Sequence, residues 1–126
     1  GMSGVTGDNF LQILESRLDN VVFRLGFASS RNQARQLVTH GNMVVNERAT
    51  DIPSYLLSVG DQISWTERGR KTEHFKMMAE EIRGKPIPEW LSLDAQNMQG
   101  RVLTAPTRDL VGTRVDDRLI IEYYSR

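Results

Sequence analysis

The residues best suited to chemistry in this sequence are the arginines of its first half. Between Arg17 and Arg48 there are five arginines and two acids, a local excess of three positive charges, and no lysine. Arg31 and Arg35 are four residues apart, so on a helix they share one side, and Ser30 is placed to cap the start of that helix. Guanidinium groups and the N–H groups of a helix start both bind anions such as phosphate. The spacing suits a phosphate-binding surface, but the charges alone favour an ordinary solvated surface.

Catalytic patterns are absent from the sequence. It has no cysteine and two histidines, which excludes thiolate metal sites, a cysteine nucleophile and a histidine-rich metal centre. It contains no glycine-rich phosphate loop, no Gly-x-Ser-x-Gly elbow and no His-Glu-x-x-His pair. Glu80 and Glu81 would point about 100° apart on a helix, and Asp116 and Asp117 fit a turn. We therefore expect no enzymatic activity, no cofactor and no metal ion.

The composition is that of one small folded domain. The chain has 126 residues, of which 39% are apolar and 25% are charged, and its formal net charge is zero. A neutral total is unusual for a general nucleic-acid binder, so any such binding depends on how the charges are sorted along the chain. No apolar run approaches the ~20 residues that cross a bilayer, and the first residues do not resemble a signal peptide. We expect a soluble, intracellular protein without membrane contact.

The first predicted helix carries the first two arginines. Apolar residues recur at intervals of three and four from residue 9 to residue 25, which is typical of an amphipathic helix. Asp8 is the expected N-cap, and Gly26 is the expected left-handed residue that ends the helix.

The second predicted helix carries the arginine pair and covers residues 30–39. Its first residue forms a Ser-x-x-Gln capping box with Gln33, and Gly41 ends it. A third helix is expected to be capped by Thr72 and to extend to Arg83.

Short β-prone runs account for most of the remaining chain. We expect strands at 42–46, 62–66, 90–93, 101–104 and 118–124. Helices come before most of the strands, without β-α-β alternation, so the predicted fold class is α+β. We expect two to three helices packed on a small, mostly antiparallel sheet.

The order of residues in the first half resembles a known family. The stretches that carry the resemblance are 17–28, 30–31, 34–41 and 44–46. They are similar to the S4 RNA-binding domain, a helix–helix–strand module of the alpha-L type. Later stretches are similar to the bacterial-type small-subunit (30S) ribosomal proteins that contain this domain, at 52–55, 90–94, 98–100, 106–108 and 119–126.

The resemblance covers nearly all of residues 8–126 and implies the second domain and C-terminal tail of such a protein. The domain organisation that follows has three parts. Residues 1–7 are a tag remnant and a disordered start, and residues 8–66 are the S4 domain. Residues 67–126 supply a helix and strands that complete the same compact domain, followed by the C-terminal tail.

The resemblance also implies a function. It implies an rRNA-binding structural component of the small ribosomal subunit, which binds 16S-type rRNA during assembly and supports translational accuracy. The implied RNA-binding residues are Arg17, Arg24, Ser30, Arg31, Arg35, Gln36, His40, Asn42 and Asn46. No aromatic residue is among them, which favours recognition of folded RNA through its shape and backbone. Neighbouring small-subunit proteins are the implied protein partners, the isolated chain is expected to be a monomer, and its location is a cytoplasmic or an organellar ribosome.

Two other functions fit the sequence less fully. The chain could be the RNA-targeting module of an RNA-modifying enzyme or a ribosome-associated stress factor, and its neutral charge would also suit a protein–protein module.

A second basic group could extend the RNA surface or simply form a solvated helix start, and it consists of Arg68, Arg70, Lys71 and Lys76.

Overall fold

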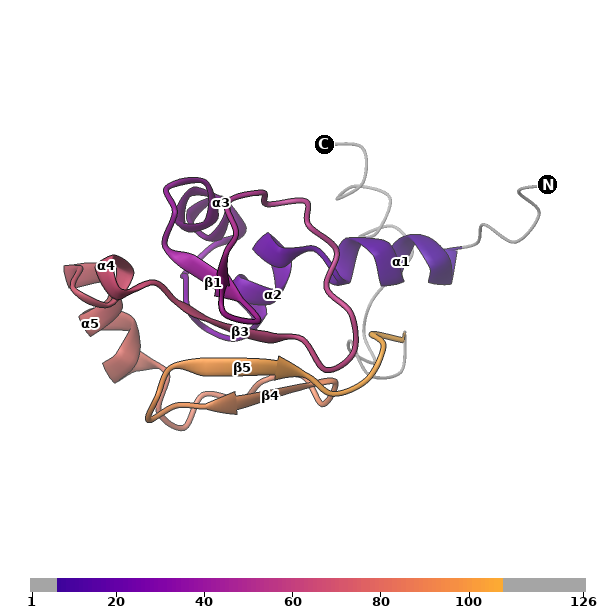
Figure 1. The fold of residues 1–126 in the computed structure, drawn as a ribbon. Coiled ribbons are helices and arrows are strands. Elements are labelled where there is room, and N and C mark those ends of the chain that lie inside the picture. The colour runs from indigo at the N-terminus through magenta and orange to yellow at the C-terminus, as the bar shows by residue number, and fades with distance from the viewer. Residues whose placement is uncertain (1–6, 108–126) are drawn as a thin grey trace.

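The computed structural model describes residues 7–107, and the side chains of residues 7–9 are outside that description. Within this range the chain forms five helices and five strands (Figure 1). In chain order they are α1 (Gly7–Glu15), α2 (Leu18–Arg24), α3 (Arg31–Thr39), β1 (Met43–Val45), β2 (Arg48–Ala49), β3 (Gln62–Trp65), α4 (Glu67–Arg70), α5 (Glu73–Glu81), β4 (Leu91–Asp94) and β5 (Gln99–Val102).

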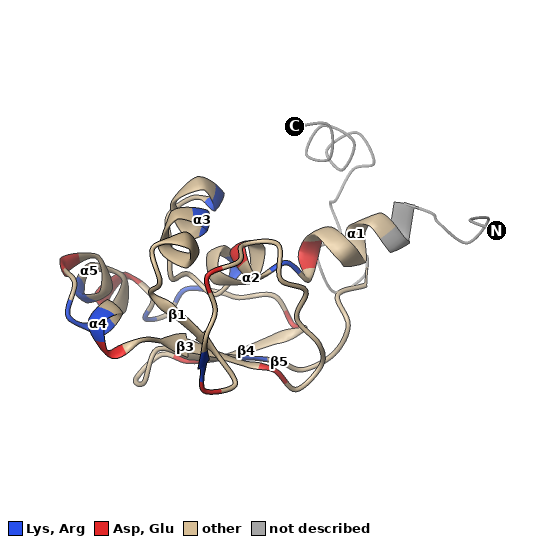
Figure 2. Ribbon diagram, turned by 45° about the horizontal axis from the view of Figure 1, so that its top comes forward, with Lys and Arg blue, Asp and Glu red and all other residues tan. Residues whose placement is uncertain are grey.

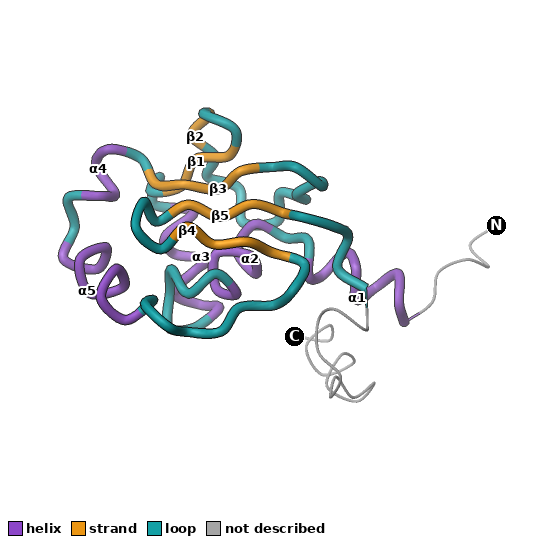
Figure 3. The backbone as a smooth tube through the Cα atoms, turned by 90° about the horizontal axis from the view of Figure 1, so that it is seen from below, coloured by secondary structure: helices purple, strands orange, loops and turns teal. Residues whose placement is uncertain are grey.

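The strands form one antiparallel sheet with helices on one of its faces. The strand order is β2-β1-β3-β5-β4, so β3 lies at the centre and joins the first half of the chain to the second. Helices α2 and α3 lie behind the strands when the molecule is seen from below, and α1 extends from one end (Figure 3). The short helices α4 and α5 lie at the opposite end of the sheet.

The core lies between this sheet and α2 and α3. Every second residue of β3 and β5 is buried, as expected for strands with one covered face. Gly100 of β5 lies directly under the end of α2, because a Cβ atom built on it would be 2.4 Å from Cδ1 of the fully buried Leu25. The missing side chain therefore lets the helix approach the sheet closely.

The prediction of one continuous helix over residues 9–25 is wrong. The helix is broken between α1 and α2 at Arg17, which has extended backbone angles (φ −64°, ψ 142°) and forms a β-bridge with Leu56. The N–H of Leu57 donates to the carbonyl of Ser16 at 2.8 Å, and the N–H of Leu18 donates to the carbonyl of Tyr55 at 2.8 Å. These tertiary bonds replace helical ones, whereas the apolar periodicity continues across the break.

The start of that helix also differs from the prediction. The first helix begins at Gly7, which places Asp8 inside its first turn and not at the N-cap.

The second helix and both glycine stops are confirmed. Ser30 is the N-cap of α3, and its hydroxyl accepts a hydrogen bond from the N–H of Gln33 at 3.1 Å. Gly26 and Gly41 have φ of +90° and +78°. In both cases the glycine N–H and the following N–H donate back into the last helical turn, the pattern of a Schellman motif.

The remaining elements are largely as expected, with shifted ends. Thr72 caps the third predicted helix, since its hydroxyl accepts from the N–H of Phe75 at 3.1 Å, but α5 ends at Glu81. The expected strands 42–46, 62–66 and 90–93 correspond to β1, β3 and β4, whereas β5 begins two residues before the expected 101. The expected strand 118–124 lies outside the described residues.

Two short elements were not predicted. The strand β2 forms a hairpin with β1 across Asn46 and Glu47, whose φ angles of 49° and 71° suit a two-residue hairpin turn. The single-turn helix α4 is capped by Thr66, whose hydroxyl accepts from the N–H of Gly69.

The α+β fold class is confirmed, while the helix count is not. Residues 7–107 contain five helices where two to three were expected, because the first is broken and α4 was missed. Within these residues no helix has the length and apolar character needed to cross a bilayer.

Candidate nucleic-acid interface

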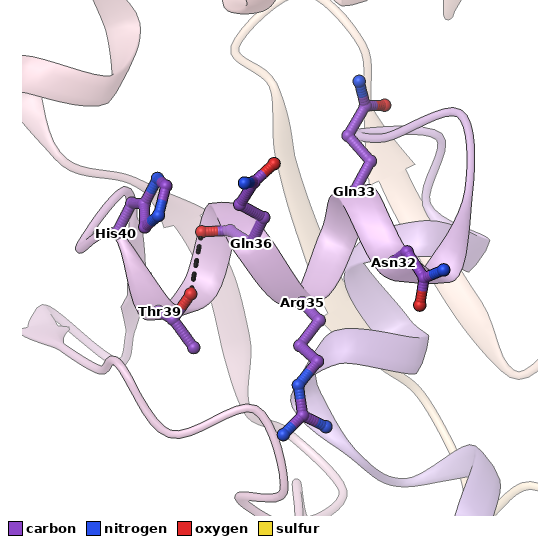
Figure 4. A pocket seen from close by; sticks show the side chains of 6 residues that line it. All are labelled: Asn32, Gln33, Arg35, Gln36, Thr39 and His40. Atoms are coloured by element: carbon purple, nitrogen blue, oxygen red, sulfur yellow. Dashed lines mark hydrogen bonds between the residues drawn. The ribbon is translucent and has the colours of Figure 1, made fainter. Parts of the chain in front are cut away.

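The exposed surface of α3 gathers polar side chains in one place. We call it the α3 face and define it by the six residues that line one open hollow of about 500 Å³, which are Asn32, Gln33, Arg35, Gln36, Thr39 and His40 (Figure 4). The opposite side of the helix is buried through Ala34 and Val38. Amide, hydroxyl, imidazole and guanidinium groups are therefore presented outward from a helix that the core holds firmly.

Arg35 is the basic centre of the α3 face. Its side chain is exposed, and among residues 7–107 it has no hydrogen-bond or ion-pair partner. Gln36 is exposed as well, and in Figure 4 the side chains of Arg35 and Gln36 extend from α3 in different directions. The guanidinium can bind a phosphate, and the amide on the same helix can bind a 2′-hydroxyl or a base edge.

The C-terminal end of α3 is joined to α4. The guanidinium of Arg68 donates to the carbonyl oxygen of His40, the C-cap of α3. The N–H of Thr66 donates to the carbonyl of Asn42 at 2.8 Å, which fixes α4 to the start of β1. Figure 2 shows basic residues on both α3 and α4, with α4 at the end of the molecule away from α1. Arg68 thus extends the basic surface beyond α3.

Arg31 differs from the solvated residue that its sequence position indicates. Its Nε donates to Oδ1 of Asn20 at 3.0 Å, and its guanidinium lies 4.7 Å from the centre of the Phe23 ring. Asn20 is fully buried and Phe23 is partly buried. Arg31 is therefore held against α2, while Arg35 is not.

Arg17 and Arg24 each lie against a carboxylate. Arg17 contacts Asp19 with two side-chain hydrogen bonds of 3.1 and 3.0 Å. Arg24 contacts Glu15 with two bonds of 3.1 and 2.8 Å. Both arginine side chains are 26% exposed. The local positive excess that the sequence indicates is thus partly neutralised in the fold.

The two asparagines of the predicted set have structural contacts. Asn42 donates from its side chain to the carbonyl of Leu37 at 3.1 Å. Asn46 lies in the β1–β2 turn, where its amide donates to Asp61 and accepts from the N–H of Gln62, both at 2.9 Å. Neither residue belongs to the α3 face.

Sequence reasoning missed part of the α3 face. Asn32, Gln33 and Thr39 line the same hollow as Arg35 and Gln36. Helical spacing would have found them, since residues three and four apart lie on one side of a helix. Asn32 and Thr39 are three and four residues from Arg35, and Gln33 is three residues from Gln36. Within residues 7–107 no group of three or more histidine or acidic side chains could hold a metal ion.

Comparisons with known proteins place this surface in a family. Residues 16–63 match the model of the S4 domain, which spans α2, α3, β1, β2 and the start of β3. The small ribosomal subunit protein uS4 of Dehalococcoides mccartyi (strain CBDB1) is 51% identical over 123 residues, which is 98% of this chain. The uS4 proteins of Syntrophomonas wolfei subsp. wolfei and Thermus thermophilus are 52% and 50% identical over the same length.

Over nearly its whole length, the chain is similar to uS4 proteins. It spans 59% of the length of each of these three relatives, which are named as ribosomal proteins and not as enzymes. The S4-domain match contains α2 and α3, so the α3 face and the paired arginines lie inside the part that defines the domain. The S4-domain match also agrees with the α+β fold expected from the sequence.

Proposed function

We propose that this chain is an rRNA-binding structural part of a small ribosomal subunit, with no catalytic role. The observation that carries the proposal is the α3 face, where Arg35 lies among amide and hydroxyl groups inside an S4 domain and has no partner in the described part of the chain. The uS4 relatives favour a ribosomal role over the targeting module of a modifying enzyme.

The RNA surface is proposed to have an outer and an inner part. The outer part consists of exposed groups on and around α3, namely Ser30, Arg35, Gln36 and His40, extended by Arg68. The inner part consists of arginines with fixed orientations, namely Arg17, Arg24 and Arg31. Asn42 and Asn46 contribute by shaping the start of β1 and the β1–β2 turn.

The proposed partners rest on the likeness to the uS4 proteins. The RNA is 16S-type rRNA, which the chain binds in a folded form during assembly. In the ribosome the chain supports translational accuracy through contacts with neighbouring small-subunit proteins. The isolated chain is proposed to be a monomer, and its place is the ribosome, in the cytoplasm or in an organelle. The division into residues 1–7, 8–66 and 67–126 stays a prediction.

A salt titration tests the proposal. Full-length chain is titrated onto a 16S-type rRNA transcript, and onto an unrelated transcript of equal length, at several salt concentrations. The logarithm of the affinity should fall linearly with the logarithm of salt, with a slope equivalent to roughly four to six neutralised phosphates. The 16S-type transcript should bind more tightly at every salt concentration. An affinity that does not respond to salt, or that is equal for both transcripts, would contradict the proposal.

A further inference from the structure

Glu15, the last residue of α1, is a buried acid at the edge of a basic surface. It is 3% exposed. Its Oε1 accepts from Nη2 of Arg24 at 2.8 Å, and its Oε2 accepts from Nε of Arg24 at 3.1 Å. The pair is bidentate, so it fixes the plane of the guanidinium as well as its position.

Asn20 connects this pair to a second arginine. Its Nδ2 donates to the carboxylate of Glu15 at 2.6 Å and to the backbone carbonyl of the same residue at 2.9 Å. Its Oδ1 accepts from Nε of Arg31 at 3.0 Å. The amide can take only this orientation, because its donor side faces a carboxylate and its acceptor side faces a guanidinium. We call Glu15, Asn20, Arg24 and Arg31 the Glu15 network.

The network leaves part of Arg24 available to a ligand. A guanidinium has five N–H donors, and Glu15 takes two of those of Arg24. The side chain is 26% exposed. The guanidinium of Arg31 stacks on the ring of Phe23, and this contact helps to hold the guanidinium in place. Both groups are thus oriented before any ligand arrives.

The charge balance of the network has a consequence for binding. Non-specific binding to nucleic acid grows with the number of phosphates that a protein neutralises. Glu15 neutralises the charge of Arg24 but leaves the other N–H donors of this guanidinium in a fixed orientation, where they can bind a ligand. A neutralised but oriented arginine adds little to the non-specific affinity for polyanions. It raises the affinity for an RNA whose backbone matches the fixed geometry.

We propose that Glu15 and Asn20 are positioning residues of the RNA interface, which hold Arg24 and Arg31 in a fixed orientation and so determine specificity for one folded RNA surface. This inference rests on the proposed rRNA-binding function. The alternative is that the network is purely structural and serves only as a buried ion pair that joins α1 to α2. The test must distinguish this role from the positioning role.

The test measures two affinities for each variant of the full chain, one for a 16S-type rRNA transcript and one for an unrelated transcript of equal length. Glu15→Gln removes the negative charge and one acceptor while it keeps the side-chain shape. We expect its affinity for the 16S-type transcript to fall about tenfold, the scale of one misplaced charged hydrogen bond. Its affinity for the unrelated transcript should rise, with a salt slope steeper by about one phosphate.

A surface variant controls for the change in charge. Glu73→Gln makes the same change at a side chain that is 91% exposed and pairs with Lys76. It should leave the ratio of the two affinities unchanged within about twofold, since surface pairs contribute little.

A second network variant keeps the test informative if Glu15→Gln does not fold. Arg24→Lys retains the charge but cannot form the bidentate contact. We expect it to lose affinity for the 16S-type transcript without a change in salt slope or in binding of the unrelated transcript.

The outcomes separate the two proposals. If the folded wild-type chain does not prefer the 16S-type transcript, the proposed function fails. If the wild-type chain prefers it and every folded network variant keeps the wild-type ratio, the network is purely structural and this inference alone is wrong.

Discussion

The Nε of Arg31 donates a hydrogen bond of 3.0 Å to Oδ1 of Asn20, a side chain with no exposed surface. This contact separates two arginines that look equivalent in the sequence. Arg31 is joined to a buried amide of α2, whereas Arg35, one turn later, is exposed and unpaired within residues 7–107. The same helix therefore carries one arginine that supports the fold and one that is available to a partner.

The difference predicts unequal effects on stability. Arg31→Ala should lower the free energy of unfolding by about 1–3 kcal/mol, because Oδ1 of Asn20 is left buried without its donor. Arg35→Ala should change it by less than about 0.5 kcal/mol. Urea unfolding of both variants measures this, and equal stability of the two variants would show that the Asn20 contact contributes nothing.

The caps of two helices provide a matched pair of variants. Ser30→Ala and Thr72→Ala each remove a hydroxyl that accepts an N–H of the first helical turn. Both should reduce stability by about 0.5–2 kcal/mol. Only Ser30→Ala should also weaken RNA binding, since Ser30 begins α3. Thermal melts together with binding isotherms check this, and a loss of RNA affinity with Thr72→Ala as well would point to stability alone.

The contact between α2 and the sheet requires glycine at position 100. In Gly100→Ala the new methyl group would lie 2.4 and 2.6 Å from the two methyl groups of Leu25, which is fully buried, so the Leu25 side chain would have to shift within the core. We expect a loss of about 1–3 kcal/mol in the free energy of unfolding. Adding Leu25→Ala should recover part of the Gly100→Ala cost, so the double variant should lose less than the sum of the single losses. Additive losses would mean that the two residues do not compete for space.

A hydrogen-bonded aspartate in the β4–β5 turn should make the free energy of unfolding depend on pH in the acidic range. The side-chain amide of Asn97 and then its backbone N–H lower the pKa of Asp94, which accepts a hydrogen bond from each. A carboxyl group with a lowered folded pKa stabilises the fold above its unfolded pKa, and this contribution is lost as the pH falls through the folded pKa. The stability difference between wild type and Asp94→Ala, measured by urea unfolding, should therefore be present at neutral pH and shrink below about pH 4. A difference that is constant down to pH 2 would contradict this origin.

Local features of the fold could be predicted from the sequence, while long-range ones could not. The capping hydroxyls of Ser30 and Thr72 and the stop at Gly41 depend on residues within one or two turns, and all three were predicted. The break at Arg17 was not, because the bonds that replace the helix come from residues 53–57, far along the chain.

The candidate site shows the same limit. The sequence indicates which residues carry positive charge, and it correctly placed Arg31 and Arg35 on one helix. Nothing in it indicates that Arg24 lies against Glu15, nine residues earlier and in another helix. Pairing of this kind decides which arginines are free, and it depends on how α1 and α2 are joined.

We propose that the α3 face binds folded rRNA, and a comparison of two arginine variants tests this binding most directly. Arg35→Ala and Arg101→Ala each remove one exposed arginine that has no partner within residues 7–107. Arg101 of β5, however, lies on the face of the sheet opposite to the helices, since its neighbours Gly100 and Val102 are buried. Binding isotherms with a 16S-type rRNA transcript should show a loss of about tenfold for Arg35→Ala, equivalent to one charged hydrogen bond, and less than about twofold for Arg101→Ala. Equal losses for the two variants, or no loss for Arg35→Ala, would contradict the account.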